Sequence, residues 1–137
     1  MKIRKILFPT DFSECADQAF THALSLAQKH NAVIHMVHAI RVGDELPITM
    51  YDFYSARLAA PGSYPIGKSD AYIRELDRIH ANLAKKADAK MLVDLEKANV
   101  NELPVLRFQE SGISPAEIIL DHADAHDIDV IVMGTHG

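Results

Sequence analysis

The sequence has one cysteine, no cluster of basic residues and no apolar run long enough to cross a membrane. Because Cys15 has no second cysteine with which to form an internal disulfide, the chain is typical of a reducing cytoplasm. Acidic residues outnumber basic ones by 19 to 14, whereas a nucleic-acid surface needs grouped Lys and Arg. Met1–Arg4 leads into a strand-like segment without the apolar core of a signal peptide. We therefore expect a cytoplasmic protein that binds neither nucleic acid nor membrane.

Two kinds of catalytic motif are also missing. There is no Gly-x-Ser-x-Gly motif, and Ser13 and Ser111, which lie in expected turns, have no assignable acid–base partner. There is no Gly-x-x-x-x-Gly-Lys-Ser/Thr loop, and so no lysine placed to reach a γ-phosphate. These absences favour binding without efficient turnover. A receiver-like or flavin-binding α/β module is an alternative, although a receiver would need acidic neighbours around Asp11 that the sequence does not supply.

The last nine residues carry the clearest pattern in the chain. The branched apolar run at Asp129–Met133 predicts a strand buried on both faces, which is typical of a parallel sheet covered by helices. Gly134 and Gly137 follow it and leave backbone N–H groups uncovered by side chains, as close approach of a phosphate requires. Glycine also serves simply to end strands, so this turn alone favours neither explanation.

A second unusual turn follows the first predicted strand, residues 3–8. Pro9 cannot donate to a strand ladder, and Asp11 stands three residues before Glu14. This spacing resembles a capping box and predicts a helix that begins at about Phe12 or Ser13 with Asp11 as its N-cap. Since ligands collect beyond the carboxyl ends of parallel strands, we expect the turns after the first and last strands to converge on one crevice.

The rest of the chain alternates between strands and helices. A helix with a face of small residues should end at Asn31, strands are predicted at 33–39 and 104–110, and a long amphipathic helix runs from Lys68 to Ala98. Ser114 and Pro115 mark the start of a helix expected to pack through Ile119 and Ala123. With 137 residues, this pattern predicts a single domain with an open α/β sandwich. Residues 41–67 lack periodicity and are expected to form a long loop or lid, or a local mini-core.

Eight histidines raise the question of a metal site. His122 and His126 are four apart on a predicted helix, a spacing at which two ligands can share a zinc ion. No Cys or third His lies close by in the sequence, and His35 and His38 should point to opposite faces of their strand. From the sequence we therefore expect no metal site.

Taken together, three segments resemble the universal stress protein family, and the likeness runs over essentially the whole chain. They are Lys5–Ser13, the Gly112–Pro115 turn before a helix, and Asp129–Gly137. The resemblance implies a Rossmann-like three-layer sandwich, similar to the adenine nucleotide alpha hydrolases, that binds adenine nucleotide. It implies ATP as the ligand, with ADP or AMP as alternatives and Mg²⁺ accompanying the triphosphate, and a role in sensing stress, with weak ATP hydrolysis as the alternative.

The resemblance also assigns roles to particular residues. Asp11 would bond the base or ribose, Ala39 would line the adenine slot and Met133 would close it. Backbone N–H groups from Gly134 to Gly137, with His136 between them, would hold the α- and β-phosphates. The full set of expected nucleotide-binding residues is Pro9, Thr10, Asp11, Ala39, Met133, Gly134, Thr135, His136 and Gly137. No catalytic residue is expected.

The chain departs from the family pattern at its end. The nucleotide-binding branch continues past the glycine motif with about nine residues, a third glycine, a Ser or Thr, and then a helix and a strand. We therefore expect residues 1–137 to be a C-terminally incomplete domain with a bare sheet edge. The absent strand commonly pairs subunits, so the homodimer expected of a full-length protein is not carried over to this chain.

Overall fold

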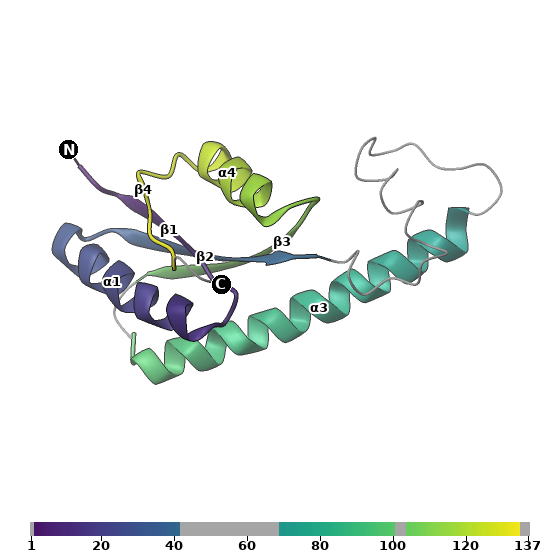
Figure 1. Cartoon of the computed structure of the whole chain (residues 1–137), viewed down its shortest axis with the longest axis horizontal. Helices are drawn as coiled ribbons and strands as arrows, with labels where there is room; N and C mark the ends of the chain where they lie inside the picture. The colour runs from purple at the N-terminus through teal and green to yellow at the C-terminus, as the bar shows by residue number, and fades with distance from the viewer. Residues whose placement is uncertain (1, 42–68, 101–103, 135–137) are drawn as a thin grey trace.

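A parallel four-stranded sheet with helices on both faces forms the structure, a computed structural model that describes residues 2–41, 69–100 and 104–134. The strands lie in the order β3-β2-β1-β4, with α1 and α3 on one face and α4 on the other (Figure 1). The elements along the chain are β1 (Lys5–Pro9), α1 (Glu14–His30), β2 (Val33–Ile40), α3 (Ser69–Ala98), β3 (Val105–Ser111), α4 (Pro115–Ala125) and β4 (Val130–Ile131). The predicted α/β sandwich is confirmed. The expected loop or lid at 41–67 lies, apart from Arg41, outside the described residues.

The main core lies between the sheet and the α1–α3 layer. Small residues of α1 let the helix lie close on the strands, and Phe20 stacks on Phe8 of β1 with ring centroids 4.9 Å apart. Met91 of α3 is fully buried in the same cluster. The buried face of α1 is the predicted one, and consists of Ala16, Ala19, Phe20, Ala23 and Ala27.

Local signals set most helix ends where the sequence predicts them. Asn31 ends α1 in the left-handed conformation, at φ 54°, with its N–H donating to the Ala27 carbonyl. Ser114 caps α4 by accepting a hydrogen bond from the Glu117 N–H at 3.2 Å, with Pro115 in the first turn. The buried positions of α4 differ from the prediction: they are Ile118 and His122, one residue earlier than expected. Helical periodicity alone did not fix which adjacent residue faces the sheet.

The final strand is shorter and more exposed than predicted. β4 has two residues, and Ile131 and Met133 keep 38% and 53% of their surface exposed. The expectation of a strand buried on both faces is wrong for the described structure, because β4 pairs only with β1 among the described strands and forms an edge. β1 and β2 each extend one residue beyond the prediction, to Pro9 and Ile40.

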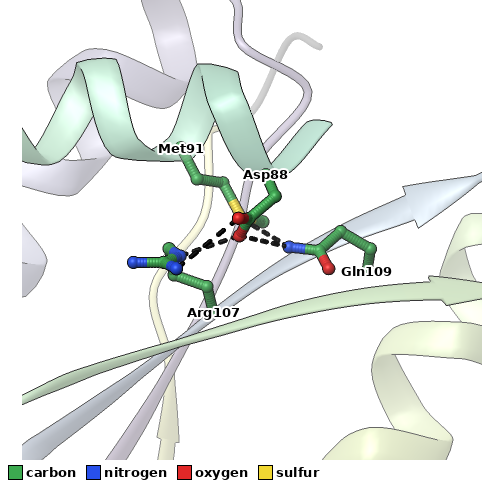
Figure 2. A network of polar contacts seen from close by, with 4 residues as sticks. All are labelled: Asp88, Met91, Arg107 and Gln109. Atoms are coloured by element: carbon green, nitrogen blue, oxygen red, sulfur yellow. Dashed lines mark hydrogen bonds and ion pairs between the residues drawn. The ribbon is translucent and has the colours of Figure 1, made fainter. Parts of the chain in front are cut away.

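A polar network ties α3 to β3 (Figure 2). The Asp88 carboxylate on α3 accepts hydrogen bonds from Arg107 Nε at 2.8 Å and from Gln109 Nε2 at 3.0 Å, both on β3. Arg107 and Gln109 alternate with residues that face α4, so β3 presents polar groups to one layer and Phe108 to the other. Within the described residues, no helix is both long and apolar enough to cross a membrane.

The carboxylate of Asp129 fastens β4 to β1. Its Oδ2 accepts hydrogen bonds from the Arg4 and Lys5 N–H groups at 2.8 and 3.0 Å, and these bonds lower the pKa of Asp129 below its ordinary value. A lowered folded-state pKa gives stability that is present above the unfolded pKa and is lost as pH falls through the folded one.

We therefore expect Asp129→Asn to lower the free energy of unfolding at neutral pH, and the deficit to shrink as the pH falls below the ordinary pKa of an aspartate and through the lowered folded-state pKa. Urea titrations at several pH values measure this. Asp124→Asn, at an exposed position near the end of α4, is the matched control. An equal deficit at neutral and acidic pH would show that the carboxylate charge has no part in the link.

Candidate functional site

A cleft of about 730 Å³ opens beyond the carboxyl ends of β1 and β2. Its walls come from the β1–α1 turn, the end of β2, the middle of α3, the start of α4 and the segment after β4. Of the nine residues expected at a nucleotide site, the cleft is lined by Pro9, Thr10, Asp11, Ala39, Met133 and Gly134. Thr135, His136 and Gly137 lie outside the described residues. Asp11 and Gly134 are thus brought from opposite ends of the chain to one crevice.

The β1–α1 turn is held by its own side chains. Thr10 Oγ1 accepts from the Phe12 N–H at 3.1 Å, and Asp11 Oδ1 accepts from the Ser13 N–H at 3.0 Å. Between these bonds Phe12 takes a left-handed backbone conformation, φ 65°, which a bulky L residue adopts only at a cost. The turn therefore has a specified shape that the surrounding bonds maintain.

The capping-box spacing predicted Asp11 as the N-cap of α1, and this prediction is wrong. Ser13 is the cap, since its hydroxyl accepts from the Ala16 N–H at 3.2 Å, and the helix begins at Glu14. Asp and Ser both cap helices well, and the left-handed residue between them moved the N-cap by two positions. The exposed Asp11 carboxylate is left at the cleft wall with one oxygen bonded to the turn.

The Asp11 carboxylate keeps its negative charge well below neutral pH. Hydrogen bonding from the Ser13 side chain is the largest cause that lowers its pKa, partly opposed by burial and assisted by the backbone N–H groups of Ser13 and Asp11 and by His38. An ionised carboxylate only accepts hydrogen bonds, so at neutral pH it is suited to hydroxyl or amino donors of a ligand.

The opposite wall of the cleft carries positive charge that the sequence patterns did not reveal. Lys86 and Lys90 lie four residues apart on α3, and both line the cleft. Arg41, the residue after β2, lines it as well. Lys90 Nζ lies 5.2 Å from the centre of the Phe12 ring. The two lysines were not expected because they lie on what the amphipathic pattern marks as a solvated helix face, and only the packing of α3 beside β2 turns them to the cleft.

A histidine side chain links β2 to the first turn. His38 Nδ1 donates to the Thr10 carbonyl at 2.9 Å, since the carbonyl oxygen can only accept, and its ring lies 4.7 Å from Phe12. His35, three residues earlier, points to the α4 face. The prediction that these two histidines face opposite ways is confirmed.

Gly134 fits a tight space against the start of α1. A Cβ added there would lie 3.0 Å from the backbone C and O atoms of Cys15 and 3.1 Å from its Cβ. This contact gives the glycine a packing role whatever it binds. Both explanations for the glycine turn, strand ending and ligand approach, therefore remain compatible with its position.

Three histidines form a second cluster on the α4 face. His35 Nδ1 lies 2.9 Å from His122 Nε2, and one ring nitrogen of each of His35, His122 and His126 lies within 4.8 Å of the others. In the sequence no third histidine lies near His122 and His126, but in the structure β2 brings His35, which is 87 positions from His122, beside them. Burial, then the charges of His122, His126 and Lys5, lower the pKa of His35 to about 4.

Comparisons with known proteins agree with the fold. The sequence profile of the universal stress protein family (Usp) matches residues 2–137. The chain belongs to the universal stress protein family. It is 30% identical over 135 residues to universal stress protein MJ0577 of Methanocaldococcus jannaschii, covering 98% of this chain and 77% of that protein.

Solved structures of universal stress proteins share the architecture. The structure of MJ0577 aligns with a TM-score of 0.69 over all of this chain and 78% of its own. UspA from Lactobacillus plantarum aligns with a TM-score of 0.60 over all of this chain and 82% of its own, at 23% identity. A further universal stress protein, solved in complex with cAMP, aligns with a TM-score of 0.50 at 16% identity, over 96% of this chain and 72% of its own.

The close contact between Gly134 and α1 predicts that a larger residue at this position destabilises the fold. We expect Gly134→Ala to lower the free energy of unfolding by about 1–3 kcal/mol, the usual cost of overpacking. Adding Cys15→Ala should restore little of this, because alanine keeps all three of the closest atoms, the backbone C and O and the Cβ. Urea denaturation of both variants measures the effect, and full recovery in the double variant would contradict the backbone contact.

Proposed function

We propose that this universal stress family protein binds an adenine nucleotide in the cleft between the β1–α1 turn and the segment after β4. The observation that carries the proposal is the meeting of an ionised Asp11, a side-chain-free Gly134 and the α3 lysines around one space. The volume of about 730 Å³ falls within the usual range for small-molecule sites.

Each wall suits a different part of the ligand. The Asp11 carboxylate accepts hydrogen bonds from ribose hydroxyls or the adenine amino group. Ala39 and Met133 offer apolar surface to the base. Gly134 provides a backbone N–H group for a phosphate, and Lys86 and Lys90 neutralise part of the phosphate charge.

Family membership supports the same proposal, since one relative of this fold was solved with a cyclic adenine nucleotide. The preferred ligand is ATP, with ADP and AMP as alternatives, and Mg²⁺ accompanies the triphosphate. The protein acts in the cytoplasm as a stress-response sensor of adenine nucleotide, not as a catalyst, and the homodimer belongs to the same proposal.

Isothermal titration of the protein with ATP, ADP, AMP, cAMP and FMN tests the ligand class directly. We expect saturable binding of at least one adenine nucleotide and none of FMN. Preference for FMN would favour the flavin module, and rapid ATP hydrolysis by the pure protein would overturn the non-catalytic role. Absence of binding to all five would refute the proposed function.

The first variant tests the acidic wall of the cleft. Asp11→Asn keeps an oxygen that can accept from the Ser13 N–H, so the turn should survive with less than about 1 kcal/mol lost. Nucleotide affinity should fall about tenfold or more, because the variant loses a charged hydrogen-bond acceptor. Titration calorimetry and urea denaturation measure the two quantities. Glu14→Gln, next to the turn but outside the cleft lining, is the control. Equal losses of affinity and stability would assign Asp11 to the turn alone.

The second variant tests the basic wall. Lys86→Met should weaken ATP binding roughly two- to fivefold, as expected for a partly exposed charge pair, and leave adenosine binding nearly unchanged. Lys85→Met removes the same charge from the neighbouring exposed position, which does not line the cleft, and should have little effect. Calorimetry at two salt concentrations makes the comparison. If both variants weakened ATP binding equally, Lys86 would act only through the net charge of the protein and not through a contact in the cleft.

A further inference from the structure

We infer that His35, His122 and His126 form a binding site for a divalent transition metal such as Zn²⁺, with Glu110 orienting one of the ligands. The proposal is independent of nucleotide binding, because none of these four residues lines the cleft. It rests on the arrangement of side chains between β2, β3 and α4.

The three imidazoles already lie close to the spacing that a metal requires. With metal–nitrogen bonds of about 2.0–2.1 Å, two ligands of a tetrahedral zinc lie about 3.3 Å apart. The His35 and His122 nitrogens are 2.9 Å apart, and all three ligand atoms lie within 4.8 Å of one another. No pair of these nitrogens therefore has to change its separation by more than about 1.5 Å to reach that spacing.

Glu110 gives His122 the tautomer that a metal ligand needs. The ring's Nδ1 lies 2.6 Å from Glu110 Oε1, and because a carboxylate accepts, Nδ1 carries the proton. The lone pair is then on Nε2, the atom that faces His35. A carboxylate that orients a metal-bound histidine in this way is a recurring feature of zinc sites.

The surroundings hold the three rings in place. His35 and His122 are buried, and the Phe108 ring packs against all three imidazoles at centroid distances of 4.6–5.3 Å. The rings of His122 and His126 stack at 4.0 Å. A chain of hydrogen bonds from His35 through His122 to Glu110 explains why these two imidazoles lie together. It does not explain why the His126 imidazole lies beside them.

Charge and access fit a metal with nitrogen ligands. Glu110 adds a negative charge beside His122 and its side chain is 32% exposed, and His126 is half-buried, so solvent reaches the cluster and water can take the fourth position. The Lys5 ammonium, which donates to the His126 carbonyl at 2.9 Å, opposes a cation. Imidazoles prefer zinc, copper, nickel or cobalt over calcium or magnesium, so we expect the site to bind metals of the first group and not those of the second.

Titration of the tag-free, nucleotide-free protein with ZnCl₂ and CoCl₂ tests the site. We expect 1:1 binding, a higher thermal midpoint with zinc, visible Co²⁺ absorption displaced by zinc, and no response to MgCl₂. His126→Gln, at the half-buried end of α4, should abolish the 1:1 phase, and Glu110→Gln should weaken it about 10- to 100-fold. His22→Gln, at an exposed position of α1, should bind like the wild type.

Two results would overturn the proposal. One is the absence of stoichiometric binding in the wild-type protein, which leaves a hydrogen-bonded histidine chain. The other is equal binding by His126→Gln and His22→Gln, which places the metal on other histidines. If circular dichroism shows that His126→Gln does not fold, Glu110→Gln decides, and its unchanged affinity would count against the site.

Discussion

Parallel pairing of β1 with β2 on one side and β4 on the other is the constraint on which the cleft depends. Because all the strands run in one direction, the segments that leave β1, β2 and β4 emerge at the same edge. Residues near 10, near 39 and near 134 thereby become neighbours. The Asp129 carboxylate reinforces the pairing that aligns the first and last strands.

The turn after β1 shows how local chemistry and site geometry are combined. The side-chain oxygens of Thr10 and Asp11 accept hydrogen bonds from backbone N–H groups of the turn, and these bonds hold Phe12 in a left-handed conformation. Phe12 can then pack on His38 and approach Lys90 of α3. Hydrogen bonds from Ser13, first from its side chain and then from its backbone N–H, lower the pKa of Asp11 and keep it ionised at the cleft wall.

The two faces of the sheet carry different chemistry. On the α1–α3 face, β2 contributes Ile34 and Met36 to an apolar core, while on the α4 face it contributes His35 to a cluster of imidazoles. Strand alternation separates these environments by a single residue. The cleft proposed for a nucleotide lies at the ends of the strands, and the histidine cluster lies beneath α4, so the two proposed sites share no residue.

The order of strands and helices could be predicted from the sequence because apolar periodicity and end signals such as Asn31 and Ser114 act within a few residues. The turn residues Asp11 and Gly134 could also be placed at one crevice from the sequence, because each follows a predicted strand and ligands collect beyond the carboxyl ends of parallel strands. The choice between Asp11 and Ser13 as the cap of α1 depended on the left-handed conformation of Phe12, which the capping spacing does not show. Tertiary packing alone decided that Lys86 and Lys90 face the cleft. It also joined His35 to His122 and His126 across 87 positions, a contact that no local pattern encodes because it depends on which face of β2 meets α4.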